Sequence, residues 1–395
     1  MMEINLFKST SKIVITCPKR MSLWLKEELS LLGYSNTEDG HMSVSLQGTL
    51  KDCMKLNLFL RTGHSVLFQI KEFYAKTPED LYKVMITIPW EDYIDPNGYF
   101  SVTSFSDNPE ILDSRYPNLK CKDAIADRIT SKKGYRPNSG PERNKTVLNL
   151  HWREDRASIY IDTSGETIAK HGYRKIPFKA PLQESLAAAL ILASKWDKNS
   201  PFINPMCGSG TLAIEAALMA QNRAPGLLRS NFGFMHLLGF DSLEWEEMRR
   251  QARLATKKHI DFKIIATDLN EDAIQAAQRN AATAGVDHVI DFICCDFRET
   301  PIPEEGGVVM INPEYGERLG EVTELQTIYK EIGDFFKKSC SGYTGYVFTG
   351  NLDLGKQVGL KPKRKIEFYN SKIDCRLLEF ELYQGTKKIK AEEKS

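Results

Sequence analysis

No run of apolar residues in this 395-residue chain approaches the ~20 needed to cross a bilayer, so we expect no membrane insertion. The first residues show no basic stretch followed by an apolar block and a cleavage site, which predicts no secretory signal and a cytoplasmic location. The eight cysteines form no CxxC pair and the seven histidines no HxxxH pair. We therefore expect neither a disulfide framework nor a metal site.

Two nucleotide-binding signatures are also missing. There is no GxGxxG motif, and no lysine follows the glycines at 208 and 210, which disfavours dinucleotide and nucleoside triphosphate sites. Hydrophobic residues at 42% and charged residues at 27% are ordinary for globular proteins and exclude a disordered or low-complexity chain. At roughly 150 residues per domain, the length predicts two or three domains.

Strand and helix patterns divide the chain into parts. Two α+β units are expected, over residues 1–70 and 71–165, where short alternating strands flank amphipathic helices. After a linker at 166–180, apolar helices alternate with short β-rich runs over 181–386, which predicts a doubly wound, mostly parallel sheet. A Lys/Glu-rich tail, 387–395, is expected to be flexible.

Charge is spread unevenly although the net charge is only +1. Residues 111–180 carry 15 basic and 8 acidic groups, whereas residues 231–330 carry 10 and 18. A basic stretch of this kind favours a polyanion, because phosphate contacts release counterions. The alternative is a solvated face without a ligand. The densest part of the stretch contains Lys132, Lys133, Arg136, Arg143 and Lys145.

One segment reads as a strand, a glycine-rich turn and the start of a helix. It runs from Phe202 through Gly208 and Gly210 to Glu215. The two glycines let the backbone approach a ligand closely, and the free N–H groups at the helix start suit an anionic group such as a carboxylate or a phosphate. The alternative is a tight turn that merely packs the helix on the strand.

Polar residues end three further strands. Asp268 is placed to accept the hydroxyls of a ribose, Asp296 to meet an adenine edge and Phe297 its face, while a fourth strand ends at Asn312. Taken singly, aspartates such as these two are more often helix N-caps than ligands. Four strand ends of these types in succession favour a shared ligand site.

The motifs resemble a known family. Residues 204–211 (NPMCGSGT) resemble the cofactor loop of class I S-adenosylmethionine (SAM) methyltransferases. Residues 312–320 (NPEYGERLG) are similar to the NPPYGERLG motif of ribosomal RNA guanine-N2 methyltransferases that carry an N-terminal THUMP domain. Residues 122–125, 136–137, 162–165 and 172–174 are similar to the THUMP signature of that family. The resemblance covers nearly the whole chain.

The resemblance implies a Rossmann-like class I methyltransferase domain preceded by a ferredoxin-like and THUMP region. It also implies methyl transfer from SAM to the exocyclic N2 amine of a guanine in 23S ribosomal RNA. The implied catalytic residues are Asn312, Pro313 and Tyr315. The implied cofactor-binding residues are Asn204, Pro205, Met206, Cys207, Gly208, Ser209, Gly210, Thr211, Asp268, Asp296 and Phe297. The implied RNA-binding residues are Lys122, Lys132, Lys133, Arg136, Arg143, Lys145 and Arg174.

This sequence departs from the family pattern at three positions. Asn204 stands where many relatives have Asp, Glu314 where they have the second Pro, and His171 where they have Arg. An amide oxygen can still accept a hydrogen bond from the cofactor's ammonium group, so activity is expected. We hypothesise that the Glu314 carboxylate pairs with the N1–H and amine edge of guanine.

Alternatives remain open from the sequence. NPxY motifs also serve adenine-N6 methyltransferases acting on RNA or DNA, and a chain inactivated at Asn204 and Glu314 would be a THUMP-containing RNA-binding protein. A nucleophilic cysteine at Cys207 or at the 294–295 pair would point to pyrimidine methylation, but small buried cysteines usually only fill a core.

Overall fold

The computed structural model describes residues 6–95, 97–108, 111, 113, 115–176, 181–316 and 322–383. Contacts divide the chain into two compact units, which we describe separately. Unit 1 comprises the described residues within 1–18, 25–169 and 225–253. Unit 2 comprises those within 19–24, 170–224 and 254–395. Within the described ranges, no helix is long and apolar enough to cross a bilayer.

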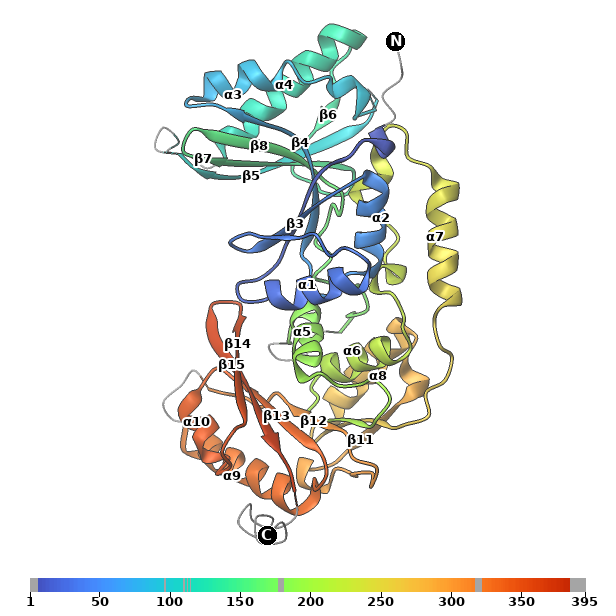
Figure 1. Cartoon of the computed structure of the whole chain (residues 1–395), viewed down its shortest axis with the longest axis vertical. Coiled ribbons are helices and arrows are strands. Elements are labelled where there is room, and N and C mark those ends of the chain that lie inside the picture. The colour runs from blue at the N-terminus through green and yellow to red at the C-terminus, as the bar shows by residue number, and fades with distance from the viewer. Residues whose placement is uncertain are drawn as a thin grey trace. The chain divides into compact units, whose positions relative to one another are not determined.

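Unit 2 is built on a seven-stranded sheet of order β11-β10-β9-β12-β13-β15-β14 (Figure 1). The first five strands are parallel, and β15 and β14 complete the sheet as an antiparallel hairpin. The expected doubly wound, mostly parallel sheet is therefore confirmed. The strands are β9 (Phe202–Pro205), β10 (Ile264–Asp268), β11 (Ile290–Cys294), β12 (Val308–Ile311), β13 (Thr344–Thr349), β14 (Arg364–Asn370) and β15 (Ile373–Glu381).

Helices cover this sheet. The apolar face of α9 packs Tyr329, Ile332 and Phe336 into a core with Val309 and Val347 of the central strands. Every residue of α6 is buried, as expected for a helix that contacts β9, β10 and two neighbouring helices. The helices of unit 2 are α5 (Glu184–Ser194), α6 (Thr211–Ala220), α8 (Glu271–Ala284), α9 (Val322–Ser339) and α10 (Leu352–Gln357).

Unit 1 has a single eight-stranded sheet of order β2-β3-β1-β4-β8-β7-β5-β6. The two α+β units expected from the sequence share this sheet, because β4 pairs antiparallel with β8 along nearly its whole length. The strands are β1 (Ser11–Thr16), β2 (Glu38–Asp39), β3 (Ser43–Gly48), β4 (Ser65–Tyr74), β5 (Tyr99–Asp107), β6 (Asn138–Ser139), β7 (Thr146–Arg153) and β8 (Arg156–Asp162).

Local sequence signals start and stop the helices of this unit. Thr49 and Asp52 form a reciprocal capping box, and Thr77 and Asp80 form another. Gly134, with φ +84°, ends α4 in the left-handed conformation. The helices are α1 (Ser22–Leu31), α2 (Leu50–Phe59), α3 (Pro78–Met85), α4 (Tyr116–Lys133) and α7 (Ser242–Leu254). Its short 3₁₀ helices are η1 (Leu6–Lys8), η2 (Trp90–Asp92), η3 (Pro225–Leu228) and η4 (Gly233–His236), whereas η5 (Asp287–Val289) and η6 (Phe297–Glu299) belong to unit 2.

The segment 225–253 lies inside the residues expected to form the methyltransferase domain, yet its contacts are with unit 1. Gly233 approaches the end of β8 so closely that a Cβ there would lie 2.3 Å from the Asp162 carbonyl oxygen. The Phe234 N–H donates to the Thr163 carbonyl oxygen (3.0 Å). The sequence pattern missed this docking because buried apolar residues such as Phe232, Phe234 and Trp245 do not reveal which sheet they pack against.

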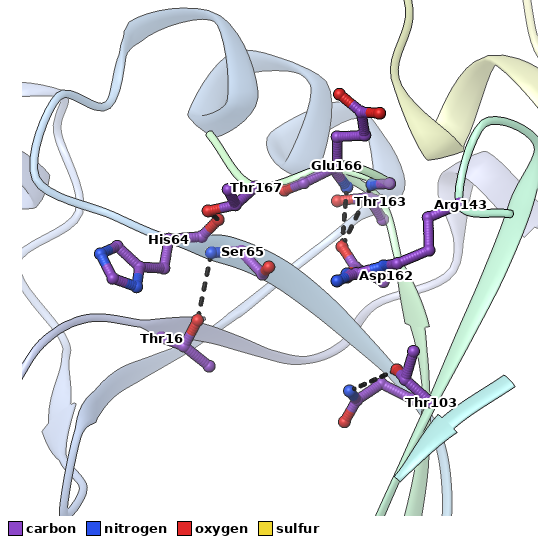
Figure 2. Close-up of polar contacts among 12 residues, drawn as sticks. Thr16, His64, Ser65, Thr103, Arg143, Asp162, Thr163, Glu166 and Thr167 are labelled. Atoms are coloured by element: carbon purple, nitrogen blue, oxygen red, sulfur yellow. Dashed lines mark hydrogen bonds and ion pairs between the residues drawn. The ribbon is translucent and has the colours of Figure 1, made fainter. Parts of the chain in front are cut away.

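Asp162 organises the turn at the end of β8, as Figure 2 shows. Its fully buried carboxylate accepts hydrogen bonds from the backbone N–H groups of Ser164 and Gly165 and from the Arg143 guanidinium (2.6 Å). Burial nevertheless raises the pKa of Asp162 to about 6, because desolvation of the charged form outweighs these interactions.

This raised pKa predicts a pH-dependent stability. Because the folded state holds the Asp162 proton more tightly than the unfolded chain, whose carboxyl titrates near ~3.9, the free energy of unfolding should decrease as pH rises from 4 to 6. The loss should reach about 2–3 kcal/mol. Urea unfolding across this range, with Asp162→Asn as the non-titrating reference, measures it. A difference between the two proteins that is independent of pH would contradict the prediction.

Candidate active site

The strand order of unit 2 places its sequence motifs at one crevice. β9 lies between β10 and β12, and the chain runs outward from β9 to β11 before it returns to β12. Such a reversal is the topological switch point at which open α/β sheets bind ligands, beyond the carboxyl ends of their strands. The glycine-rich loop follows β9 and Asn312 follows β12, so both emerge at this point.

The loop after β9 adopts the unusual backbone that its glycines permit. Gly208 and Gly210 have φ of +56° and +82°, and Met206 is a non-glycine residue at +54°. The Gly208 N–H donates to the Asp268 Oδ2 atom (2.9 Å) at the end of β10. No side chain caps α6, because its N-cap is Gly210. The expected loop and Asp268 are thus brought together.

Asn204 is the penultimate residue of β9, and its buried side-chain amide has a hydrogen-bond partner for only one of its two polar atoms. Its Nδ2 group donates to the Met310 carbonyl oxygen of β12 (2.9 Å), while its Oδ1 atom accepts no hydrogen bond from the described residues. A buried unpaired acceptor costs about 1–3 kcal/mol, which is recovered when a ligand supplies a donor. The amide therefore joins the two strands and presents an acceptor.

Asn312 follows β12 and shows the same feature. Its Oδ1 atom is buried and accepts no hydrogen bond from the part of the chain that is described. Pro313 beside it is buried, whereas the Glu314 side chain is exposed to solvent. The remainder of the family-like motif, residues 317–320, lies outside the described residues.

Tyr315 is held in place by the C-terminal hairpin. The Asn370 Nδ2 group of β14 donates to the Tyr315 hydroxyl (2.7 Å). A Cβ on Gly350 would lie 3.1 Å from two carbons of the Tyr315 ring, so only glycine allows this approach without displacement. The ring is half-buried and packs against the core of the sheet. Asn370 and Gly350 were missed by sequence reasoning, because neither belongs to a motif.

Polar side chains support the cofactor loop from behind. Arg174, expected at an RNA surface, is only 16% exposed; it donates to the Thr211 hydroxyl (2.9 Å) and pairs with Glu184 (3.5 Å). Asn280 of α8 donates to the Ser209 carbonyl oxygen (3.3 Å). His171 lies 2.7 Å from Glu215 of α6, and both side chains are buried.

The third strand end differs from the expected adenine site. Asp296 pairs with Arg298 (2.6 Å) and accepts from its backbone N–H, which is the N-cap arrangement raised as the alternative. The Arg298 guanidinium lowers the pKa of Asp296. Phe297 is buried against Phe335 with ring centroids 5.9 Å apart. In this conformation the Phe297 ring belongs to the core.

Two cysteines near the loop, Cys207 and Cys295, have thiol pKa values above the usual range. Burial is the main cause of a raised pKa at the Cys207 thiol, and the nearby Asp268 carboxylate adds to it. The pKa of Cys295 is also raised by burial. Because the thiolate is the reactive form, neither the Cys207 thiol nor the Cys295 thiol fits the nucleophile that the pyrimidine-methylating alternative requires.

The residues expected to bind RNA separate into two groups. Arg136 pairs with Asp123 (3.3 Å) and Asp127 (3.0 Å), and Arg143 pairs with Asp162. The lysines have no ion-pair partner among the described residues, and all but the half-buried Lys122 are exposed. These lysines are Lys122, Lys132, Lys133 and Lys145.

A parallel sheet with a glycine-rich loop and an asparagine at its switch point defines a Rossmann-like methyltransferase domain. The chain belongs to the family described as the RMKL-like methyltransferase domain, whose model matches residues 171–379. A THUMP domain model matches residues 75–162, and an RlmL ferredoxin-like domain model matches residues 12–67. The resemblance drawn from the sequence motifs is thereby confirmed.

Known proteins resemble the chain over most of its length. The ribosomal RNA large subunit methyltransferase K/L of Syntrophotalea carbinolica is 36% identical over 94% of this chain and 53% of its own. The chain spans about half the length of the curated relatives it matches.

Solved structures are similar as well. SMU.472, a protein solved in complex with SAH, has a TM-score of 0.87 and 27% identity, covering 96% of this chain and all of the other. A predicted N6-adenine-specific DNA methylase from Listeria monocytogenes has a TM-score of 0.85 and 29% identity, covering 96% of this chain and 97% of its own.

The two loop glycines should differ in their tolerance of a side chain. A Cβ on Gly210 would lie 2.8 Å from the Ala277 Cβ, whereas a Cβ on Gly208 would have no neighbour within 4 Å. Both substitutions place a side chain in the left-handed region, at a cost of about 1–2 kcal/mol. Gly210→Ala should add the cost of the clash and destabilise the protein by at least about 1 kcal/mol more than Gly208→Ala. Urea unfolding measures both, and equal losses would refute the predicted difference.

Proposed function

We propose that this chain is a SAM-dependent methyltransferase that methylates the exocyclic N2 amine of a guanine in ribosomal RNA, most specifically 23S ribosomal RNA. The observation that carries the proposal is the pair of unpaired buried acceptors, the Oδ1 atoms of Asn204 and Asn312, at adjacent strand ends of one switch point. The family membership and the names of the relatives, which are ribosomal RNA methyltransferases, support ribosomal RNA as the substrate.

The residues present fit the cofactor. The Asn204 Oδ1 atom is available to accept from an ammonium group, and the uncapped start of α6 offers N–H donors. The Asp268 carboxylate is only half-buried and lies against the glycine loop, where it suits ribose hydroxyls. SAM would supply an electrophilic methyl group on a sulfonium centre, and the protein would supply alignment.

The chain's own residues would act on the nucleophile. The lone pair of an exocyclic amine is delocalised into the base, so acceptors in the amine plane must hold its hydrogens as positive charge develops. The Asn312 Oδ1 atom and the Pro313 carbonyl oxygen would take these roles. Tyr315, anchored by Asn370, would contact the everted base and offset part of an unstacking cost of a few kcal/mol. The attacking nitrogen would also have to lie in line with the methyl group, at a distance of ~3–3.5 Å from it.

RNA recognition is assigned to unit 1. The four lysines without ion-pair partners among the described residues form its electrostatic footprint, and the THUMP model matches residues 75–162, which carry β5, β6, β7 and β8. Arg174 is left out of this surface because its partners lie behind the cofactor loop. Recognition of RNA through its shape and backbone suits such a surface.

An adenine-N6 methyltransferase is the second candidate. One observation favours it: the similar structure from Listeria monocytogenes is described as a predicted N6-adenine-specific DNA methylase. Adenine N6 is also an exocyclic amine that the same two acceptors would hold. Analysis of the methylated nucleoside separates the two candidates.

Removal of the Asn312 acceptor tests the proposal. The wild-type protein should bind SAM in calorimetry and produce N2-methylguanosine in 23S ribosomal RNA. Asn312→Ala should retain SAM affinity within twofold, because the cofactor contacts lie after β9 and β10, but lower kcat by about 10²–10³. A wild-type chain that binds no SAM would overturn the proposed SAM-dependent activity. An Asn312→Ala variant with normal kcat would overturn the role of Asn312 as an acceptor for the amine.

The Glu314 hypothesis predicts a change in base selection. A carboxylate attracts the N1–H of guanine but repels the N1 lone pair of adenine, so Glu314→Pro should lower the ratio of guanine to adenine methylation about 10- to 100-fold. Glu314→Gln is the matched isosteric variant, and it should lower the ratio as well, because its amide can accept from guanine N1–H and donate to adenine N1. Mass analysis of nucleosides from short RNAs measures the ratio, and an unchanged ratio in Glu314→Pro counts against the hypothesis.

A further inference from the structure

The hairpin of β14 and β15 reaches the same edge of the sheet as the candidate active site. β15 runs antiparallel to β13 and pairs with it from Glu381 to Arg376, opposite Thr349 at the carboxyl end of β13. Residues 373–375 pair only with β14, so the hairpin tip extends beyond the carboxyl ends of the parallel strands (Figure 1). Asn312 follows the carboxyl end of β12, the strand paired with β13.

The tip touches the catalytic loop directly. Asn370, the last residue of β14, donates to the Tyr315 hydroxyl (2.7 Å). A two-residue turn follows, in which Ser371 has φ +56° and Lys372 is exposed. Lys372 thus lies two residues from a side chain that contacts the proposed base-binding tyrosine.

The hairpin carries uncompensated positive charge. Residues 361–376 contain six basic and two acidic residues, within a chain whose net charge is only +1. Both carboxylates of this stretch are neutralised: Glu367 and Asp374 each pair with Arg20 (3.0 Å) and with Arg376 (3.3 and 2.5 Å).

The remaining acidic residues of the two strands are neutralised too. Glu379 pairs with Arg364, and Glu381 pairs with Lys363. The exposed Lys365 and Lys372 have no ion-pair partner among the described residues. The charge that the hairpin offers to a ligand is therefore positive, at a place where the rest of the site offers carboxylates and amide oxygens.

We propose that the tip of the β14–β15 hairpin is a second RNA-contacting surface, at which Lys372, supported by Lys365, binds backbone phosphates of the nucleotides that flank the target base. A base that enters the site at Asn312 and Tyr315 remains joined to its neighbours, so their phosphates must pass close to the residues that surround Tyr315. Lysine suits this contact as a point charge that binds phosphate without reading sequence.

This inference rests on the proposed function, and its test uses the full chain with a transcript of 23S ribosomal RNA as the probe. Lys372→Glu should raise the Kd for the transcript at least fivefold and lower the slope of log Kd against log salt by about 1. Lys365→Glu should act in the same direction with a smaller change, because it lies farther from the tip. SAM affinity, the melting temperature and kcat at saturating RNA should stay at wild-type values.

Lys338→Glu is the matched control. Lys338 is equally exposed and lies at the end of α9, before the amino end of β13, on the opposite edge of the sheet. The same reversal of charge there should leave the Kd and the salt slope unchanged. Lys372→Gln, which removes the charge without reversing it, should give an intermediate Kd.

Equal salt slopes and Kd values in Lys372→Glu, Lys338→Glu and the wild type would overturn the inference. A Lys372→Glu variant with normal RNA affinity but a lower kcat would also overturn it, because the tip would then act only on the position of Tyr315. A wild-type chain that binds the transcript but not SAM would instead count against the proposed function. The role of the hairpin would still be tested in that case, because it is measured by the Kd for RNA.

Discussion

The hydrogen bond from the Asn204 side chain to the Met310 carbonyl oxygen joins the two strands on which the whole site depends. β9 and β12 pair over only two residues, and they diverge where ligands enter an open sheet. A side-chain donor at this point supplies the link that the backbone ladder no longer makes. An aspartate, which many relatives have here, could not donate this bond when ionised. The departure from the family pattern is therefore a gain in structural support that retains one acceptor for a ligand.

A second layer of polar residues fixes the loop against α6 and α8. Arg174 and Asn280 each bond to an atom of the loop or of the first helical residue, and both come from segments outside the loop itself. Buried polar groups of this kind are costly unless they are paired. Here the paired polar groups hold the loop, whose backbone has several positive φ angles, in a single conformation. The His171–Glu215 pair shows that the histidine departure is likewise accommodated within the buried layer.

The fold and the motif positions could be predicted from the sequence because both depend on local signals. Alternating strands and helices predicted the parallel sheet, strand ends singled out Asp268 and Asn312 as candidates, and the motif resemblance added Asn204. Side-chain partnerships could not be predicted, because they depend on which segments the tertiary fold brings together. Arg174 looks like an RNA contact by its charge and motif, yet its partners Thr211 and Glu184 lie behind the loop. Phe297 follows a strand end as a stacking residue would, but α9 covers it with Phe335.

Formal charge along the sequence and free charge on the folded surface are different quantities. The segment 111–180 is the most basic by count, but four of its arginines (Arg115, Arg136, Arg143 and Arg153) are paired with aspartates of the same unit. The C-terminal hairpin belongs to the half of the chain in which residues 231–330 are strongly acidic, yet its own carboxylates are all paired and its exposed lysines are not. A polyanion responds to the uncompensated charges, since a guanidinium already bound to a carboxylate must give up that partner before it can bind a phosphate. An RNA-binding surface is therefore better located by subtracting the ion pairs than by counting basic residues.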